Sequence, residues 1–274
     1  MSAGVEGWLV ALDDTAHTVW DDAGCRAHLS PREERRAERF LRPEAAVAYV
    51  RGRSAIRVVL GHVLGEAPGE VRIATAPGGG PVLLDHQDRS VSWSITAGVL
   101  LVAVGRGARV GVDVEVLRPV RSPARVLRTF YPGVHTLGAF REPETFFSAW
   151  TLLEAAVKAT GRGLSRGARQ VRLHRPPGAV RCVLAGVADG SECAWTGRTD
   201  RFAVPGSTTE VMTAVVTHGA RTPLRLHTWR LPEPARLPAP GRPPGAAEPL
   251  PDRAARRDAA AVPLTSSEEL ESTP

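Results

Sequence analysis

Two long helical patterns, each followed by several short β-rich runs, constrain the fold more than any other feature of this sequence. The first, EAAVAYVRGRSAIRVVLGHVLG, begins after Pro43, and the second, EPETFFSAWTLLEAAVKATG, ends at Gly161, a residue type that commonly terminates helices. Runs such as SVSWSIT and TTEVMTAVVTHG are rich in β-branched residues and favour strands. Because strands come in groups after each helix, the sequence predicts the α+β class.

The order of helix and strands occurs roughly twice, with a division near residue 110. We therefore expect an N-terminal α+β half over residues 1–110 and a C-terminal half over 111–231, related as a pseudo-twofold duplication. Residues 232–274 are rich in proline, alanine and charge and poor in bulky apolar side chains. Such a segment cannot bury enough surface to fold, so it is predicted to be a disordered tail.

The segment LSPREERRAERF predicts a further helix with a well-defined start. Ser30 is a suitable N-cap, Pro31 suits the first turn, and Glu33 stands three residues after the serine, as a capping box requires. The mixed charge of this helix is typical of a solvated face, although its arginines could also hold phosphates.

Charge and composition limit the classes of partner. The 274 residues carry a formal net charge of +6, which favours an anionic partner. Aromatic residues make up only 5% of the chain, so it lacks the stacking side chains of a nucleic-acid binder. The cysteines have no CxxC spacing and are odd in number, which argues against zinc and a disulfide framework; they are Cys25, Cys182 and Cys193. Without a signal peptide or a membrane-spanning run, we expect a cytoplasmic protein.

The run GVDVEV places two carboxylates on one face of a predicted strand. Asp113 and Glu115 are two residues apart, while the intervening valines face the opposite side, toward a core. Two adjacent carboxylates repel each other, and a bound Mg²⁺ commonly offsets this repulsion, because the ion is held by carboxylates and phosphate oxygens. The alternative is an edge strand with a solvated acidic face.

Lys158 is the only lysine among the 35 lysine and arginine residues of the chain. Trp150, Glu154 and Lys158 are spaced i, i+4 and i+8, so they share one face of the second long helix. One interpretation is a surface Glu–Lys pair, worth about 0.3–0.5 kcal/mol. The other is functional, because lysine can release a proton when its surroundings depress its pKa, whereas arginine effectively cannot.

Glycine-rich segments offer a weaker signal. GRGARVG, which contains Gly105, Gly107 and Gly111, superficially suggests a dinucleotide-binding loop. It lies between two strand patterns with no helix behind it, so we predict a hairpin turn.

GVDVE, followed some forty residues on by WTLLEAAVKATGRGL, resembles the signature pair of the surfactin-synthetase-activating 4′-phosphopantetheinyl transferases. The second motif of that family usually reads W-[S/T]-x-K-E-A-x-x-K-x-x-G-x-G-L. The segments LSPREERRAERF and RGRSAIRVVLG also look like its N-terminal helices. The resemblance covers roughly residues 7–231 and excludes the tail.

The resemblance implies an enzyme that moves the phosphopantetheine arm of coenzyme A onto a serine of an acyl or peptidyl carrier protein, in secondary metabolism. It implies a monomer with a pseudo-twofold α+β fold and the active site between its halves. By resemblance, Asp113, Glu115 and Glu154 would be Mg²⁺ ligands, and Glu154 and Lys158 would act in catalysis. Lys158 would either help deprotonate the serine or protonate the leaving 3′,5′-ADP.

Three positions depart from the family pattern. Leu153 stands where a lysine precedes the motif glutamate, Gly80 replaces the lysine of a G-K-P turn, and Ile95 replaces a histidine. Each loss removes a group expected to hold a phosphate of coenzyme A. Residues that could still hold the cofactor lie on the N-terminal helices and the following strand; they are Arg36, Arg53, Arg57 and Ser94.

The departures leave a second hypothesis open. A family member with weakened coenzyme A binding would act as a carrier-protein scaffold, or would catalyse a different reaction on a carrier-bound intermediate.

Overall fold

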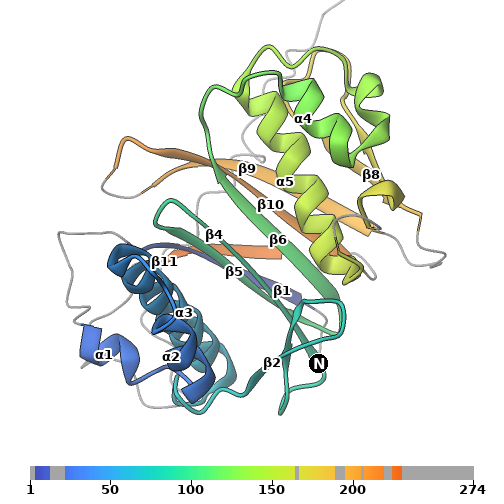
Figure 1. The fold of residues 1–274 in the computed structure, drawn as a ribbon. Helices are drawn as coiled ribbons and strands as arrows, with labels where there is room; N and C mark the ends of the chain where they lie inside the picture. The colour runs from blue at the N-terminus through green and yellow to red at the C-terminus, as the bar shows by residue number, and fades with distance from the viewer. Residues whose placement is uncertain are drawn as a thin grey trace, which may run out of the picture.

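The computed structural model describes residues 4–12, 22–163, 167–188, 195–204, 207–218 and 224–229. Two sheets lie in the middle of the molecule, with helices on the outer side of each (Figure 1). This mixture of segregated helices and strands confirms the predicted α+β class. The predicted tail over residues 232–274 lies outside the described residues. No helix in the described part of the chain is long and apolar enough to cross a membrane.

The N-terminal half is built on a four-stranded sheet with the strand order β11-β1-β5-β4. Its strands are β1 (Gly4–Ala11), β4 (Arg89–Thr96), β5 (Val99–Arg106) and β11 (Leu224–Trp229). β1, β5 and β4 are antiparallel neighbours, while β11 pairs in parallel with β1. The last described strand of the chain thus joins the sheet that contains the first. The other elements of this half are α1 (Asp22–Arg26), α2 (Pro31–Ala37), α3 (Pro43–Leu64) and the hairpin of β2 (Ile73–Thr75) and β3 (Pro81–Leu83).

The C-terminal half is built on a three-stranded sheet with the order β6-β10-β9, antiparallel throughout. Its strands are β6 (Arg109–Val116), β9 (Trp195–Ala203) and β10 (Glu210–His218). The helix α5 (Pro143–Thr160) packs on this sheet. The remaining elements are α4 (Pro123–Phe130), η1 (Pro132–Leu137), η2 (Ala168–Gln170) and the hairpin of β7 (Val171–His174) and β8 (Val183–Val187).

The two halves use their elements in the same order. Each begins with a strand, continues with a long helix and a small hairpin, and ends with a large hairpin. In both halves the second strand of the large hairpin pairs with the opening strand, so β1-β5-β4 corresponds to β6-β10-β9.

Apolar cores between the helices and sheets hold these layers together, and three of them involve the sheets. One lies between α3 and the first sheet, one surrounds α5, and the third lies between the two sheets. The third contains Leu9 and Leu101 from the first sheet with Val112 and Val114 from β6. The valines of GVDVEV therefore face a core, as predicted. Burying a Val or Leu side chain contributes about 1.5–3 kcal/mol, so this contact fixes the face that β6 turns away from the core.

Local sequence signals determine the helix ends. Ser30 caps α2, with the Glu33 N–H donating to its hydroxyl and the Glu33 carboxylate accepting from the Ser30 N–H, which confirms the capping box. Gly161 ends α5 with a left-handed φ of 67°, which confirms the predicted stop. Both ends lie beside the cleft described below.

The prediction of a hairpin turn at GRGARVG is wrong. The turn joins β5 to β6, but these strands belong to different sheets and do not pair. A hydroxyl on β4 contacts this turn: Ser90 Oγ donates a 2.6 Å hydrogen bond to the Ala108 carbonyl. A side chain at Gly105 would collide with both groups, so the glycine permits this approach.

Candidate active site

The face of β6 opposite its valines lies against α5. A Cβ added at Gly111 would lie 2.0 Å from the Ala155 carbonyl oxygen and 2.5 Å from the Ala159 nitrogen, so strand and helix backbones are in direct contact there. Asp113 and Glu115 follow Gly111 at alternate positions and therefore point to the same side. Their carboxylates face α5 instead of forming a solvated acidic edge.

Asp113 is only 4% exposed and is held from both halves of the molecule. Lys158 Nζ on α5 donates to its Oδ1 at 2.8 Å, and Ser94 Oγ on β4 donates to the same oxygen at 2.7 Å. Its Oδ2 is buried and has no hydrogen-bond partner. Burial raises the pKa of Asp113, and the Lys158 charge and the hydroxyl of Ser94 offset part of this effect.

Glu115 and Glu154 complete an acidic group around Asp113. Burial raises the pKa of Glu154, and the charges of Asp113 and Glu115 raise it further, against the opposing charge of Lys158. Burial and the charge of Asp113 likewise raise the pKa of Glu115, although Arg118 lies 3.5 Å from its carboxylate. Three carboxylates that disfavour one another's ionised forms attract any cation of suitable size.

Lys158 lies in the last turn of α5, one turn before the Gly161 stop. Besides Asp113, its Nζ donates to the Val112 carbonyl at 3.0 Å. These two contacts use two of the three donors of an ammonium group, so the third remains for a ligand. The ion pair of Lys158 is with Asp113 on a different element, and a simple surface pair with Glu154 does not describe it.

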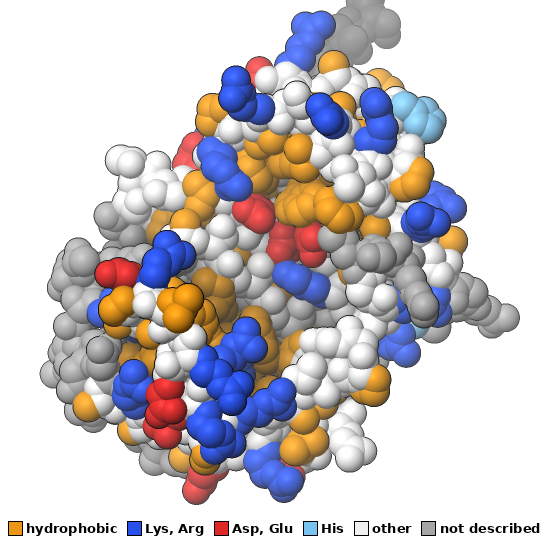
Figure 2. Space-filling view, in the orientation of Figure 1, with side chains coloured by type: hydrophobic (Ala, Val, Ile, Leu, Met, Phe, Trp, Pro, Cys, Tyr) orange, Lys and Arg blue, Asp and Glu red, His pale blue; other side chains and the backbone are white. Residues whose placement is uncertain are grey.

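A cleft of about 1510 Å³ lies between the two halves. Glu154, Lys158 and Gly161 contribute to its lining from α5, and the turn at residues 78–80 contributes from the β2–β3 hairpin. Arginines of the N-terminal helices form another part of its wall; they are Arg32, Arg35, Arg36, Arg39 and Arg53. Figure 2 shows acidic side chains gathered in the hollow between the halves, with Lys and Arg side chains gathered over the helices of the N-terminal half.

The N-terminal arginines proposed from the sequence do not behave alike. Arg36 and Arg53 line the cleft, and Arg53 also pairs with Glu33 and lies over the Trp93 ring at 4.9 Å. Arg57 is 2% exposed and lies outside the cleft lining. Its guanidinium donates to Glu33 at 2.7 Å and to two backbone carbonyls.

The prediction that Arg57 binds the cofactor is therefore corrected. Contacts within the protein already occupy the donors of its guanidinium and tie α2 to α3. Ser94 is also absent from the cleft lining. Its hydroxyl donates to Asp113 and orients that carboxylate.

The three positions that depart from the family pattern also differ in where they lie relative to the cleft. Gly80 and Ile95 line the cleft, and Ile95 is 45% exposed there. Leu153 is 0% exposed and packs in the core around α5. A residue at position 153 faces away from the cleft, so only two of the three departures change its wall.

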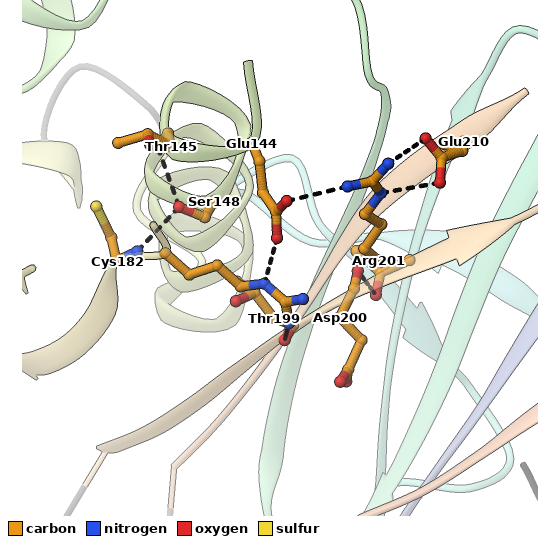
Figure 3. A network of polar contacts seen from close by, with 10 residues as sticks. Glu144, Thr145, Ser148, Cys182, Thr199, Asp200, Arg201 and Glu210 are labelled. Atoms are coloured by element: carbon orange, nitrogen blue, oxygen red, sulfur yellow. Dashed lines mark hydrogen bonds and ion pairs between the residues drawn. The ribbon is translucent and has the colours of Figure 1, made fainter. Parts of the chain in front are cut away.

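Polar contacts fix the N-terminal end of α5, the helix that carries Glu154 and Lys158. Glu144 accepts from Arg181 at 2.6 Å and from Arg201 at 3.2 Å, and Arg201 also pairs with Glu210 on β10 (Figure 3). One turn along, Ser148 Oγ accepts from the Cys182 N–H at 2.9 Å. The helix is thus joined to the strands of its own half at one end and faces the cleft at the other.

The acidic group has the chemistry of a divalent-cation site. Within the described residues, no three acidic, histidine or cysteine side chains lie close enough together to form a ready-made ligand set. The donor types nevertheless fit a hard cation, since all three side chains offer carboxylate oxygens. The buried Oδ2 of Asp113 lacks a partner that such an ion would supply. Asp113, Glu115 and Glu154 are the residues that could hold it.

Comparison with known proteins gives this geometry a context. The sequence model of the 4′-phosphopantetheinyl transferase superfamily matches residues 109–205, a range that contains the acidic group and Lys158. The chain is 32% identical over 174 residues to the 4′-phosphopantetheinyl transferase HetI of Nostoc sp. (strain PCC 7120), covering 72% of that protein and 61% of itself. The chain belongs to the 4′-phosphopantetheinyl transferase superfamily. It is also 28% identical over 155 residues to the putative 4′-phosphopantetheinyl transferase slr0495 of Synechocystis sp. (strain PCC 6803), across 63% of that protein and 54% of this chain.

Family membership confirms the resemblance read from the paired motifs and makes the chain an enzyme of the transferase class. Sequence reasoning nevertheless missed other residues of the cleft wall, among them Tyr49, Arg89, Trp93 and Arg109. The alternation of β4 offered one signal, because Arg89, Val91, Trp93 and Ile95 share one face of the strand and all four line the cleft. Nothing in the sequence indicated that Arg109, on β6, lies in the same wall.

Proposed function

We propose that this chain transfers the 4′-phosphopantetheine arm of coenzyme A to a serine of an acyl or peptidyl carrier protein. The serine oxygen attacks the phosphorus next to the pantetheine, a new phosphodiester bond forms, and the bond to 3′,5′-ADP breaks. The hydroxyl proton is released and the leaving phosphate keeps the bonding electron pair. The observation that carries this proposal is a group of three carboxylates and one lysine at the edge of an arginine-lined cleft.

Asp113, Glu115 and Glu154 would hold Mg²⁺ in this proposal. The ion, when bound, neutralises charge on the pyrophosphate and orients it for in-line attack. The contacts of Asp113 prepare it for this role: Lys158 and Ser94 both engage Oδ1, so Oδ2 is the oxygen left for the ion.

Lys158 acts as a cation in this proposal. Its two donated hydrogen bonds suit an ammonium group, which has no lone pair with which to accept a proton. The third N–H is available to the phosphate and stabilises the charge that develops on the leaving 3′,5′-ADP. Glu154 lines the cleft beside it, so its carboxylate is placed to accept the serine proton.

The two halves are proposed to be copies of one duplicated unit, which the matching strand connections of β1-β5-β4 and β6-β10-β9 support. The site lies between the halves of a single chain, so a monomer is sufficient for the reaction. Secondary metabolism is the proposed setting, and coenzyme A is the co-substrate.

Mass spectrometry of carrier proteins incubated with the full chain, coenzyme A and Mg²⁺ tests the proposal. A gain of the arm's mass on the carrier is expected, and a carrier whose serine is replaced by alanine is the control. Glu154→Gln should reduce the initial rate by roughly 10²–10⁴-fold. Absence of the mass gain across several acyl and peptidyl carriers contradicts the proposal.

A second candidate function follows from the wall of the cleft. Gly80 and Ile95 line it and offer neither charge nor a side-chain hydrogen bond. A chain with weakened coenzyme A binding would act as a scaffold for carrier proteins or on a carrier-bound intermediate. Calorimetry with coenzyme A separates the two candidates, because tight, Mg²⁺-dependent binding excludes the scaffold.

A further inference from the structure

Both acceptors that hold Lys158 are themselves held by serines of β4. Lys158 Nζ donates to the Val112 carbonyl at 3.0 Å and to Asp113 Oδ1 at 2.8 Å. Ser94 Oγ donates to the same Asp113 oxygen at 2.7 Å. Ser92 Oγ accepts from the Val112 N–H at 3.1 Å. A lysine of the C-terminal half is therefore placed, through two residues of β6, by two hydroxyls of the N-terminal half.

Val112 is bonded in this way because it lies on an edge strand. Among the described strands β6 pairs only with β10, so the backbone groups along its other edge have no ladder partner. Val112 is fully buried, and buried backbone groups rarely remain unpaired. Ser92 pairs with its N–H and Lys158 with its carbonyl, although β4 lies beside β6 without joining its sheet (Figure 1). These two side chains thus replace a neighbouring strand.

The ammonium group of Lys158 depends on these acceptors for its position. The lysine side chain is 30% exposed and has a flexible four-carbon stem, so fixing it costs rotamer freedom. Ser92, in contrast, is only 4% exposed. Without the Ser92 hydroxyl the Val112 N–H would be buried and unpaired, and the edge of β6 would shift to find it a partner. The Val112 carbonyl would then move as well, and with it one of the two points that hold Lys158.

We infer that Ser92 is a positioning residue for Lys158, because it holds the backbone of Val112 and so fixes the carbonyl that receives the ammonium group. The inference rests on the proposed function, in which the third N–H of Lys158 stabilises the charge that develops on the leaving 3′,5′-ADP. An ammonium group held by one acceptor instead of two spends less time in the position that this step requires. Ser92 acts on the reaction only through Val112 and Lys158.

The single lysine of the chain permits a direct test by nuclear magnetic resonance. Labelling the full chain with ¹⁵N-lysine gives one side-chain ammonium signal, and its absence in Lys158→Arg assigns it. At a fixed pH, Ser92→Ala should shift this signal and speed the exchange of its protons with water several-fold, because the ammonium group is held less firmly. Ser92→Thr keeps a hydroxyl at the same place and should restore the wild-type signal.

Initial rates of carrier-protein modification give a second measurement. Ser92→Ala should lower kcat about 10- to 100-fold, because a 1 Å displacement of a catalytic group can cost about 10²-fold. KM for coenzyme A should stay within about threefold, since the weakened contact acts on the departing phosphate. Ser92→Thr should recover most of the lost rate.

Ser148 provides a matched control. Its buried hydroxyl also accepts from a backbone N–H, that of Cys182 at 2.9 Å, but it lies ten residues before Lys158, about 15 Å along α5. Ser148→Ala should melt at a lower temperature, as Ser92→Ala does, and should keep the wild-type ammonium signal and kcat. Circular dichroism melts verify that each variant is folded. If Ser92→Ala does not fold, Ser92→Cys replaces it, because a thiol is similar in shape and accepts only weakly.

The outcomes separate the inference from the proposed function. An unchanged ammonium signal in the Ser92 variant, or an equal change in Ser148→Ala, overturns the inference even if the wild type modifies carrier proteins. A changed signal with an unchanged kcat overturns it as well. A change confined to the Ser92 variant, in a protein whose wild type loads no carrier, supports the placement of Lys158 by Ser92 and removes the transfer reaction.

Discussion

The contact between β6 and α5 leads to a prediction about Gly111. The substitution Gly111→Ala would place a methyl group 2.0 Å from the Ala155 carbonyl oxygen, whereas real Cβ contacts essentially never fall below 3.0 Å. The clashing atom belongs to helix backbone, so no rotamer change can relieve it. The strand and the helix must separate by about 1 Å or distort locally.

This separation should reduce both stability and activity. Overpacking of this kind costs about 1–3 kcal/mol, and each kcal/mol lowers the melting temperature by roughly 2–4 °C in a chain of this size. Asp113 lies two residues from the substitution, and its 2.8 Å contact with Lys158 spans the widened gap. A 1 Å displacement of catalytic groups can reduce the rate by about 10²-fold, so arm transfer should fall by about that factor.

Circular dichroism melts and the carrier-protein mass assay measure the two effects. Gly4→Ala is the matched control, because Gly4 also lies in a strand and no atom lies within 4 Å of the added Cβ. It should melt and react as the wild type does. A Gly111→Ala protein that melts within about 1 °C of the wild type and keeps its transfer rate would refute the reasoning.

Three further predictions concern side chains around the cleft. Arg57→Ala should lower the free energy of unfolding in urea by about 3–5 kcal/mol, because it leaves Glu33 buried with one ion-pair partner fewer. Burial alone would raise the pKa of Glu33, but Arg53, Ser30 and Arg57 lower this pKa below its ordinary value. The ionised carboxylate therefore stabilises the fold above the unfolded-state pKa, and this stabilisation is lost as the pH falls through the folded-state pKa. The melting temperature of Glu33→Gln should accordingly fall less steeply with decreasing pH in the acid range than that of the wild type. Ser94→Ala should weaken Mg²⁺ binding in calorimetry, whereas Ser90→Ala, which removes a hydrogen bond of the same strand, should leave it unchanged.

The parts of the fold that depend on residues close together in the sequence could be predicted from it. The capping box at Ser30 and the stop at Gly161 are local signals, because each satisfies backbone groups within one turn of itself. The alternation in GVDVEV likewise assigned the valines to a core and the carboxylates to the opposite face. That face became a site because α5 packs directly on Gly111.

Two mistaken interpretations have different physical causes. The role of Arg57 depends on how α2 and α3 meet, and no local pattern specifies which of two arginines one turn apart will face inward. Leu153, in contrast, could have been placed: it lies on an apolar stripe of α5 with Ala149 and Ala156, and all three residues are fully buried.

The serines of β4 account for the dependence of the site on both halves. Ser90, Ser92 and Ser94 alternate along the strand, and each hydroxyl bonds to β6 or to the turn before it. Ser90 donates to the Ala108 carbonyl, Ser92 accepts from the Val112 N–H, and Ser94 donates to Asp113. These hydroxyls join edge strands of two sheets whose backbones do not pair. Asp113 therefore receives one hydrogen bond from the N-terminal half and another from Lys158 of the C-terminal half. Since both bonds converge on Oδ1, the orientation of its free oxygen is set only when the halves are packed together, which makes the contact between the sheets part of the proposed active site.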